Sequence, residues 1–222
     1  MADETHIRTL PPVADPAPLG LAAFALTTFL LSAQNAQLTD GKDAWLGFAL
    51  AYGGTIQLLA GMWEFRNRNV FGATAFSTYG GFWIGLGLWA LLVSKTAGGP
   101  LGELSDLGWI LLAFAIFNTY MMLWATAVTP AVFLVFLTLE ATEIILFIGF
   151  FKANTTIIKV GGYVGIATAA VAWYTSAAGV INGIGGRHVV PVGKPWWIPS
   201  TTARPGSPMP RADVPAQEFR AR

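Results

Sequence analysis

Charged residues are scarce in this chain: they make up 11% of its 222 residues, where a soluble domain carries about 25%. The formal net charge is only +1, and no basic run interleaved with aromatic residues points to a nucleic-acid partner. Cysteine is absent, which excludes a disulfide framework and thiolate chemistry. The histidines, His6 and His188, lie outside the apolar segments, and no metal cluster or nucleophile–base set can be assembled. We therefore predict that the chain is not an enzyme and holds no metal or cofactor.

Apolar residues are abundant instead, at 54% of the chain. They gather in stretches long enough to cross the hydrocarbon core of a bilayer, which takes about 20 residues of helix. Lipid offers no partners to the backbone of an open strand, so each stretch must be helical. The sequence predicts an all-α integral membrane protein with six transmembrane helices. The predicted spans are Leu19–Ala36, Ala44–Trp63, Val70–Val93, Leu107–Val128, Ala131–Phe151 and Val160–Ile181.

The ends of the chain differ from this central part. We expect residues 1–17 to form a cytoplasmic N-terminal segment, residues 18–186 the transmembrane domain, and residues 187–222 a tail. The tail contains seven prolines and no helical period, so we expect it to be mostly disordered. An even number of spans places both termini on one side, and that side carries nine Lys and Arg residues against four on the other. This excess favours cytoplasmic termini, although it falls to five against four when the four arginines farthest from the last helix are excluded.

Polar and small residues form stripes along several spans, because helix neighbours lie three and four positions apart. Two interpretations compete. Small residues let membrane helices approach closely, and Ser or Thr often bonds to its own helix; alternatively, the stripes line a pore. The amides of Asn35 and Gln57 are harder to attribute to packing, because each has four hydrogen-bonding positions to satisfy. On the first span the stripe consists of Gly20, Phe24, Thr27, Thr28, Leu31 and Asn35.

Acidic residues inside a span are costly and by default mark a functional site or a protected interface. Glu140 and Glu143 lie three residues apart on the fifth span, so they are candidates for sharing a proton. The alternative is that they face a neighbouring subunit or bond to Thr138, Thr142 or Asn118. Glu64, at the end of the second span, is either a partner of Arg66 and Arg68 or a gating group at a pore mouth.

Three motifs carry a resemblance to a known family. The stretch Asp15-Pro16-Ala17-Pro18-Leu19-Gly20-Leu21 resembles the Asn-Pro-Ala-Pro-Leu-Gly-Leu signature of the acetate uptake transporter family, which includes bacterial succinate–acetate permeases and yeast ammonia/acetate exporters. Tyr52-Gly53-Gly54 with Gln57 and Ala60-Gly61 is similar to its second helix. The run from Phe71 to Trp83, Phe-Gly-Ala-Thr-Ala-Phe-Ser-Thr-Tyr-Gly-Gly-Phe-Trp, is similar to its third. The resemblance covers roughly residues 15–187.

This resemblance implies a homo-hexamer in the plasma membrane, in which each protomer is a six-helix bundle with its own pore. Acetate and related short monocarboxylates, and sometimes succinate, would move with protons or through a channel-like path. The family's hydrophobic constriction maps onto Phe24, Tyr79 and, by a less direct alignment, Leu139. The residues expected to contact the substrate are Thr28, Gln57, Thr74, Ser77 and Thr78, and the entrance motif is carried by Asp15, Pro16, Pro18 and Gly20.

The chain departs from the family pattern in two places. Asp15 stands where the family has Asn and adds negative charge near an anion entrance. The Glu140/Glu143 pair has no counterpart in the signature and makes proton coupling attractive, with Glu64 as a further proton-coupling candidate. Two alternatives to acetate transport are a channel for a small neutral solute such as ammonia, urea or water, and a membrane scaffold whose glycine stripes serve only packing.

Overall fold

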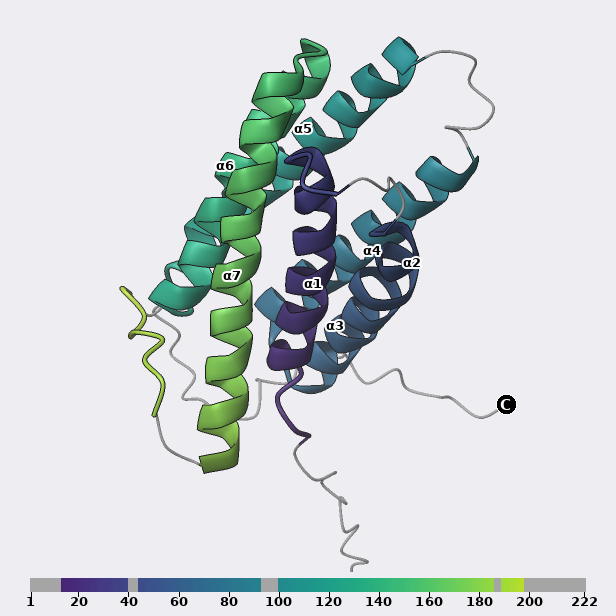
Figure 1. The fold of residues 1–222 in the computed structure, drawn as a ribbon. Helices are drawn as coiled ribbons and strands as arrows, with labels where there is room; N and C mark the ends of the chain where they lie inside the picture. Colours follow the sequence, from purple (N-terminus) through teal and green to yellow (C-terminus); the bar gives the residue numbers. More distant parts are fainter. Residues whose placement is uncertain (1–12, 40–43, 93–99, 186–188, 198–222) are drawn as a thin grey trace, which may run out of the picture.

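The computed structural model describes residues 13–39, 44–92, 100–185 and 189–197, and in these residues all the regular structure is helical (Figure 1). Six helical segments are long and apolar enough to cross a membrane. The prediction of an all-α membrane protein with six spans is therefore confirmed. The helices are α1 (Ala17–Asn35), a continuous second segment made of α2 (Leu46–Phe48), η1 (Ala49–Ile56) and α3 (Gln57–Arg66), then α4 (Val70–Leu92), α5 (Pro100–Ala125), α6 (Pro130–Phe151) and α7 (Thr155–Gly185).

Local sequence signals start two of these helices. At α1, the carboxylate of Asp15 accepts a hydrogen bond of 2.9 Å from the Ala17 amide. At α6, the Thr129 hydroxyl accepts one of 3.2 Å from the Val132 amide, and Pro130 occupies the first turn. A proline there costs little, because the amide it lacks has no partner within the helix. Both starts follow from residue type alone.

The second membrane segment is not a regular α-helix. Residues Ala49–Ile56 form a π-helix, a wider turn that is rare and frequent at functional sites. Gly53 in this segment lies against the Thr27 side chain of α1, and a Cβ there would come within 2.7 Å of the Thr27 Cβ. Gln57 is the first residue after the π-helix, so the wider turns set the face on which its amide lies.

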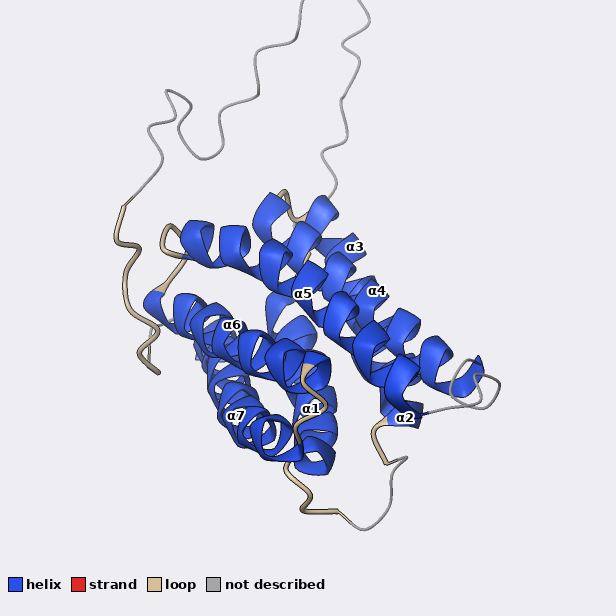
Figure 2. Ribbon diagram, turned by 90° about the horizontal axis from the view of Figure 1, so that it is seen from above, coloured by secondary structure: helices blue, strands red, loops and turns tan. Residues whose placement is uncertain are grey.

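The helices form two groups, with α1 between them (Figures 1 and 2). In one group α7 packs along both α1 and α6, and α6 packs along α5. In the other, the second segment packs against α4 and also touches α1. Between α4 and α5 the contact is largely aromatic: Phe82 meets Phe114 with ring centroids 4.6 Å apart, and Tyr79 meets Phe117 at 5.5 Å. The space between the groups is therefore filled by side chains from α1, α4, α5 and α6.

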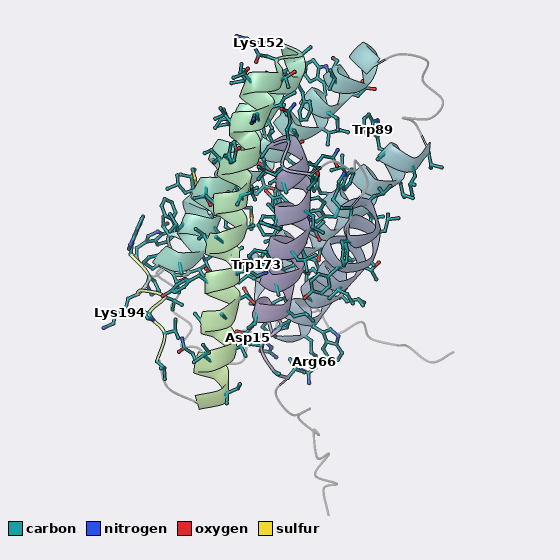
Figure 3. All side chains as sticks on the ribbon, in the orientation of Figure 1. Asp15, Arg66, Trp89, Lys152, Trp173 and Lys194 are labelled. Carbon is teal, nitrogen blue, oxygen red and sulfur yellow. The ribbon has the colours of Figure 1, made fainter. Side chains whose placement is uncertain are left out.

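Two helices are longer than the predicted spans. The structure starts α5 at Pro100 rather than Leu107, and α7 runs from Thr155 to Gly185 rather than from Val160 to Ile181. The prediction counted apolar residues only, whereas a helix can continue past the hydrocarbon core with polar residues on its end turns. Figure 3 shows Lys152 at one end of the bundle and Asp15, Arg66 and Lys194 toward the other.

The described part of the C-terminal tail, residues 189–197, packs against the bundle. The Trp197 indole donates a 2.9 Å hydrogen bond to the Thr126 hydroxyl, and the Trp196 amide donates one of 3.0 Å to the Thr126 carbonyl. The Ala131 amide bonds to the Val192 carbonyl at 3.1 Å. Residues 189–197 of the predicted tail thus have defined contacts with the bundle; residues 1–12, 187–188 and 198–222 of the two terminal segments lie outside the described part.

Candidate functional site

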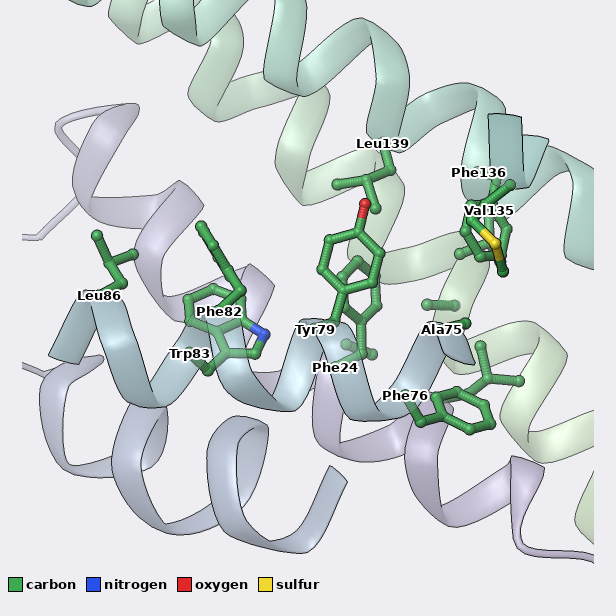
Figure 4. Packing of buried hydrophobic residues seen from close by; sticks show 14 of the residues in the cluster. Phe24, Ala75, Phe76, Tyr79, Phe82, Trp83, Leu86, Val135, Phe136 and Leu139 are labelled. Carbon is green, nitrogen blue, oxygen red and sulfur yellow. The ribbon is translucent and has the colours of Figure 1, made fainter. Parts of the chain in front are cut away.

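Phe24, Tyr79 and Leu139 come from three different helices and meet near the middle of the bundle (Figure 4). Phe24 of α1 and Tyr79 of α4 pack edge to face, with ring centroids 5.8 Å apart. In Figure 4 the Tyr79 hydroxyl points toward Leu139 of α6. All three side chains are at least nine-tenths buried. The structure thus brings together the residues that the family resemblance assigns to the constriction.

These three side chains line two cavities at once. One, the Glu143 cavity, has a volume of about 40 Å³ and is also lined by Thr28, Trp83 and Glu143. The other, the Gln57 cavity, has a volume of about 30 Å³ and is also lined by Gln57 and Phe76. Each has room for only one or two water-sized groups. Phe24, Tyr79 and Leu139 therefore form a partition between two small chambers.

A third and wider cavity adjoins the first. This Trp45 cavity, of about 270 Å³, contains Gln34, Trp45 and Trp89 in its lining. It shares Leu31, Asn35, Phe82, Leu111 and Leu146 with the Glu143 cavity. The stripe predicted on the first span is partly recovered here, because Phe24, Thr28, Leu31 and Asn35 all line this series of cavities.

Several buried polar atoms along the cavities have no hydrogen-bond partner in the described structure. They are Thr28 Oγ1, Trp83 Nε1 and Glu143 Oε2 in the Glu143 cavity, Gln57 Oε1 in the Gln57 cavity, and Gln34 Oε1 and Trp45 Nε1 in the Trp45 cavity. Buried polar atoms in native proteins are nearly always paired, so each such atom needs an explanation. Their location suits groups that bond to a small polar solute.

Most other hydroxyls behave differently. Thr27, Thr119, Thr138, Thr142, Thr168 and Thr175 each donate to the carbonyl four residues earlier in the same helix. The packing interpretation of the stripes therefore accounts for these residues. Thr28 differs from them, because its buried hydroxyl has no partner and its side chain lines the Glu143 cavity.

The two glutamates of α6 have different surroundings. Glu140 faces α5, where its carboxyl group accepts a hydrogen bond of 2.7 Å from the Asn118 amide and lies 2.8 Å from the Thr119 hydroxyl oxygen. Glu143 is 3% exposed and lines its cavity, with Oε1 3.2 Å from the Tyr79 hydroxyl. Glu140 is thus hydrogen-bonded to a neighbouring helix, whereas Glu143 lies on the cavity wall beside the constriction.

The remaining expected substrate contacts lie elsewhere. Thr74 lines a separate cavity between α4 and α5, together with Trp124 and Trp197. Ser77 packs directly on Gly61 of α3. Thr78 is half-buried and is not among the residues that line the three cavities. Only Thr28 and Gln57 of the five expected contacts border the cavities beside the constriction.

Glu64 and the entrance motif also occupy defined positions. Glu64 is fully buried at the end of α3, where it accepts a 3.3 Å hydrogen bond from the Asn67 amide, and it does not line the three cavities. The Pro18 carbonyl accepts a 2.6 Å hydrogen bond from Ser176 of α7. Gly20 lies against the Phe76 ring of α4. The entrance motif, which also contains Pro16, thus docks the start of α1 onto its neighbours.

Two residues of this site have a larger role than the sequence indicates. Trp83 ends a family motif, and its indole N–H is a buried donor without a described partner. The sequence names Asn118 only as a possible partner of the glutamates, and the bond to Glu140 is present. Asn118 is fully buried and links three helices. A lone amide in the middle of an apolar span was the available signal for Asn118, since such a group must find partners.

Comparison with known proteins places these observations in a family. The family model described as GPR1/FUN34/yaaH matches residues 5–192. Acetate permease A of Emericella nidulans is 39% identical over 208 residues, which cover 86% of this chain and 70% of the permease. The succinate-acetate/proton symporter SatP of Escherichia coli is 34% identical over 182 residues, covering 82% of this chain and 96% of the symporter.

The fold is shared as well. The solved structure of the bacterial acetate channel SatP aligns with a TM-score of 0.77 at 33% identity, over 82% of this chain and 99% of that one. The relatives named here are a permease, a symporter and a channel, in agreement with the prediction of a multi-pass membrane transporter rather than an enzyme. The motif resemblance is confirmed, and the chain belongs to the GPR1/FUN34/yaaH family.

Proposed function

We propose that this chain carries acetate and related short-chain monocarboxylates, with succinate as a larger substrate, across the membrane through the cavities beside Phe24, Tyr79 and Leu139. The observation that carries the proposal is the partition itself. Three apolar side chains separate two small cavities, and each cavity is lined by buried polar atoms without a partner. This is the arrangement expected of a path that excludes hydrated ions by dewetting and holds a small solute on either side.

The chemistry of the lining suits a carboxylate. In the Glu143 cavity the Thr28 hydroxyl and the Trp83 indole are free to donate hydrogen bonds, which a carboxylate accepts. In the Gln57 cavity the Gln57 amide has an unpartnered oxygen, which can accept a hydrogen bond from a protonated acid. Among the described residues, no Lys, Arg or His lines any of the three cavities. Binding by neutral donors is weak enough to release the substrate, as conduction requires.

The start of α1 supports an anion entrance on the side of the Gln57 cavity. Helix N-termini attract anions, because their first amides have no partner within the helix. In this chain the Asp15 carboxylate already accepts a hydrogen bond from the Ala17 amide. It thereby adds a negative charge that opposes an approaching carboxylate, so we infer that Asp15 lowers the rate of anion entry relative to relatives with Asn.

We further propose that the protein is a homo-hexamer of the plasma membrane with cytoplasmic termini. The constriction and its flanking cavities are lined by residues of a single chain, so each protomer would have its own path. Large apolar side chains such as Leu59, Ile116 and Val180 are exposed on the outside of the bundle, where lipid or neighbouring protomers would cover them. The excess of Lys and Arg on the side of the termini supports the orientation.

Flux into liposomes tests the transported substrate. Purified protein should admit labelled acetate faster than protein-free liposomes do, and unlabelled propionate or succinate should compete with the label. The alternative is a channel for neutral solutes. The same experiment should test it, because Ammonia transport outward protein 2 of Saccharomyces cerevisiae is 38% identical over 175 residues. Competition by urea or methylammonium, without competition by propionate, would support that alternative and refute carboxylate transport.

A further inference from the structure

A chain of buried hydrogen bonds connects the constriction to both glutamates of α6. It begins with Asn118 of α5, whose orientation is set by its amide nitrogen. That nitrogen donates to the Phe136 carbonyl at 2.9 Å and to the Glu140 carboxylate at 2.7 Å. The amide oxygen of Asn118 therefore faces the other way, and it lies 2.9 Å from the Tyr79 hydroxyl.

The donor and acceptor roles along these hydrogen bonds depend on how many protons each group can donate. An amide oxygen only accepts, so Tyr79 must donate its single hydroxyl proton to Asn118. The Tyr79 oxygen also lies 3.2 Å from Glu143 Oε1, and with its proton committed it can only accept there. Glu143 must then be the donor, which requires a protonated carboxyl group. If Glu143 were ionised, Tyr79 would have to turn its proton to Glu143 and leave the fully buried Asn118 oxygen without a donor.

The charges around Glu143 favour the same state. Glu140, three residues away on the same helix, is the neighbouring acidic residue, and its carboxyl group contacts Asn118 and Thr119 of α5. From α4, Tyr79 and Trp83 share the cavity wall with Glu143; α1 and α5 contribute no charged side chain to this cavity, and α7 contacts this part of α6 through the Thr142–Thr168 hydroxyl pair. In the described part of the chain no Lys, Arg or His lines this cavity, so a buried negative charge at Glu143 would be costly in the membrane.

We propose that Glu143 hands a proton to the permeating carboxylate next to the constriction, and that Asn118, anchored by Glu140, is the positioning residue that keeps this proton on Glu143. This inference rests on the proposed function. A carboxylate in the Glu143 cavity takes the proton, which leaves a neutral acid and a Glu143 carboxylate. The Tyr79 hydroxyl then turns to donate to Glu143 Oε1.

This proton exchange gives a role to three features: the apolar partition, the unpartnered Oε2 atom of Glu143 and the Trp45 cavity. A neutral acid crosses the apolar partition at a lower cost than an anion does. Rotation of the Glu143 carboxyl group exchanges its two oxygens, which brings the proton to the unpartnered Oε2 position. The wider Trp45 cavity adjoins the Glu143 cavity and supplies the route by which water returns a proton to Glu143. One proton thus accompanies each monocarboxylate, and the same steps run backwards in the opposite direction.

Acetate accumulation in liposomes under an imposed pH gradient tests the hand-over. Glu143→Gln keeps a donor for the Tyr79 oxygen but cannot titrate. It should still move acetate down its own gradient, while its initial rate of accumulation under the pH gradient should fall to that of protein-free liposomes, into which acetic acid diffuses by itself. Asp106→Asn is the control, because it removes an acidic group from an exposed position of α5 outside the three cavities. It should keep the accumulation. Accumulation in Glu143→Gln that is faster than in protein-free liposomes overturns the hand-over.

Asn118→Leu tests the positioning role. Without the Asn118 oxygen, Tyr79 is free to donate to Glu143 and stabilises its carboxylate. The pH at which uptake is half-maximal should then fall by about one unit, the equivalent of one buried hydrogen bond. Slower uptake with an unchanged pH profile would show a merely structural role for Asn118 and overturn this part of the inference.

Infrared difference spectroscopy separates this inference from the proposed function. The wild type should show the carbonyl band of a protonated carboxyl group; that band should lose the Glu143 component in Glu143→Gln and stay unchanged in Asp106→Asn. If the wild type moves no acetate, the proposed function fails, and with it the hand-over, while the band alone decides whether Glu143 holds a proton. If acetate moves but the band is absent or is unchanged in Glu143→Gln, the inference fails and the proposed function stands.

Discussion

Replacement of Gly162 by alanine should separate α1 from α7. A Cβ at this position would collide with the backbone amide of Ala36 and would lie 2.7 Å from the Ser32 carbonyl oxygen and 2.8 Å from the Asn35 carbonyl carbon. These are backbone atoms at the end of α1, so no side-chain rotation can relieve the contact. Gly162 is therefore required for space, in the way that small residues let membrane helices approach closely.

The magnitude follows from these distances. Ordinary van der Waals contact begins at 3.4 Å. Relieving the Ser32 contact alone moves the helices apart by roughly 0.7 Å, and the closer Ala36 amide requires more; a gap of this size forfeits about a quarter to a half of each contact along the seam. Overpacking of this kind costs about 1–3 kcal/mol. Gly85→Ala is the matched control, because nothing lies within 4 Å of a Cβ there and the change should gain about 1 kcal/mol of helix propensity. The comparison between the two variants isolates the cost of the collision.

Thermal unfolding followed by tryptophan fluorescence measures this difference. Trp173 of α7 packs on Phe29 of α1, with ring centroids 5.4 Å apart, so the seam contributes one of the nine tryptophans whose summed emission follows unfolding. At about 2–4 °C per kcal/mol for a chain of this size, Gly162→Ala should melt several degrees below Gly85→Ala. Equal melting temperatures in the two variants would refute the argument that α1 and α7 are held at their closest approach.

Three further substitutions test other parts of the structure. Phe24→Ala removes one side of the partition, so uptake of longer acids such as butyrate should rise relative to acetate; an unchanged substrate range would argue against the constriction. Thr28→Val removes a hydroxyl that has no partner within the described structure, so the melting temperature should stay level or rise while the apparent KM for acetate increases about tenfold; an unchanged KM would remove Thr28 from the path. Trp197→Ala loses the indole bond to Thr126 and the ring contact with Trp124, which should cost about 1 kcal/mol and lower the melting temperature by about 2–4 °C; a melting temperature equal to the wild type would show that residues 189–197 do not stabilise the bundle.

The positions of the helices could be predicted from the sequence because they depend on local composition. A helix in lipid satisfies its own backbone, so a long apolar run is sufficient to specify it. The start of α1 is equally local: Asp15 reaches the nearby Ala17 amide, and Pro18 fits the first turn. The length of α7 was underestimated because its polar end turns extend beyond the apolar run.

The site depends on contacts between segments far apart in the chain, which local composition cannot specify. Glu140 and Glu143 are three residues apart, a rotation of only about 60° around the helix axis, and so they look equivalent in the sequence. In the structure Glu140 is hydrogen-bonded to Asn118 of α5, whereas Glu143 lies on the wall of its cavity. The same holds for the hydroxyls, since Thr28 borders the Glu143 cavity whereas Ser77 packs on α3.

The sequence by itself determined the membrane class, the six helices and, through its motifs, the family, because each is a property of one segment or of residues adjacent in the chain. Only the tertiary structure decided which polar atoms border the cavities and which bond to a neighbouring helix. The physical reason is that a helix has several neighbours around its circumference, and a helical stripe specifies a face but not what covers it. The π-helix before Gln57 shows the same limit, since the face it sets for that amide is defined only by packing against α1 and α4.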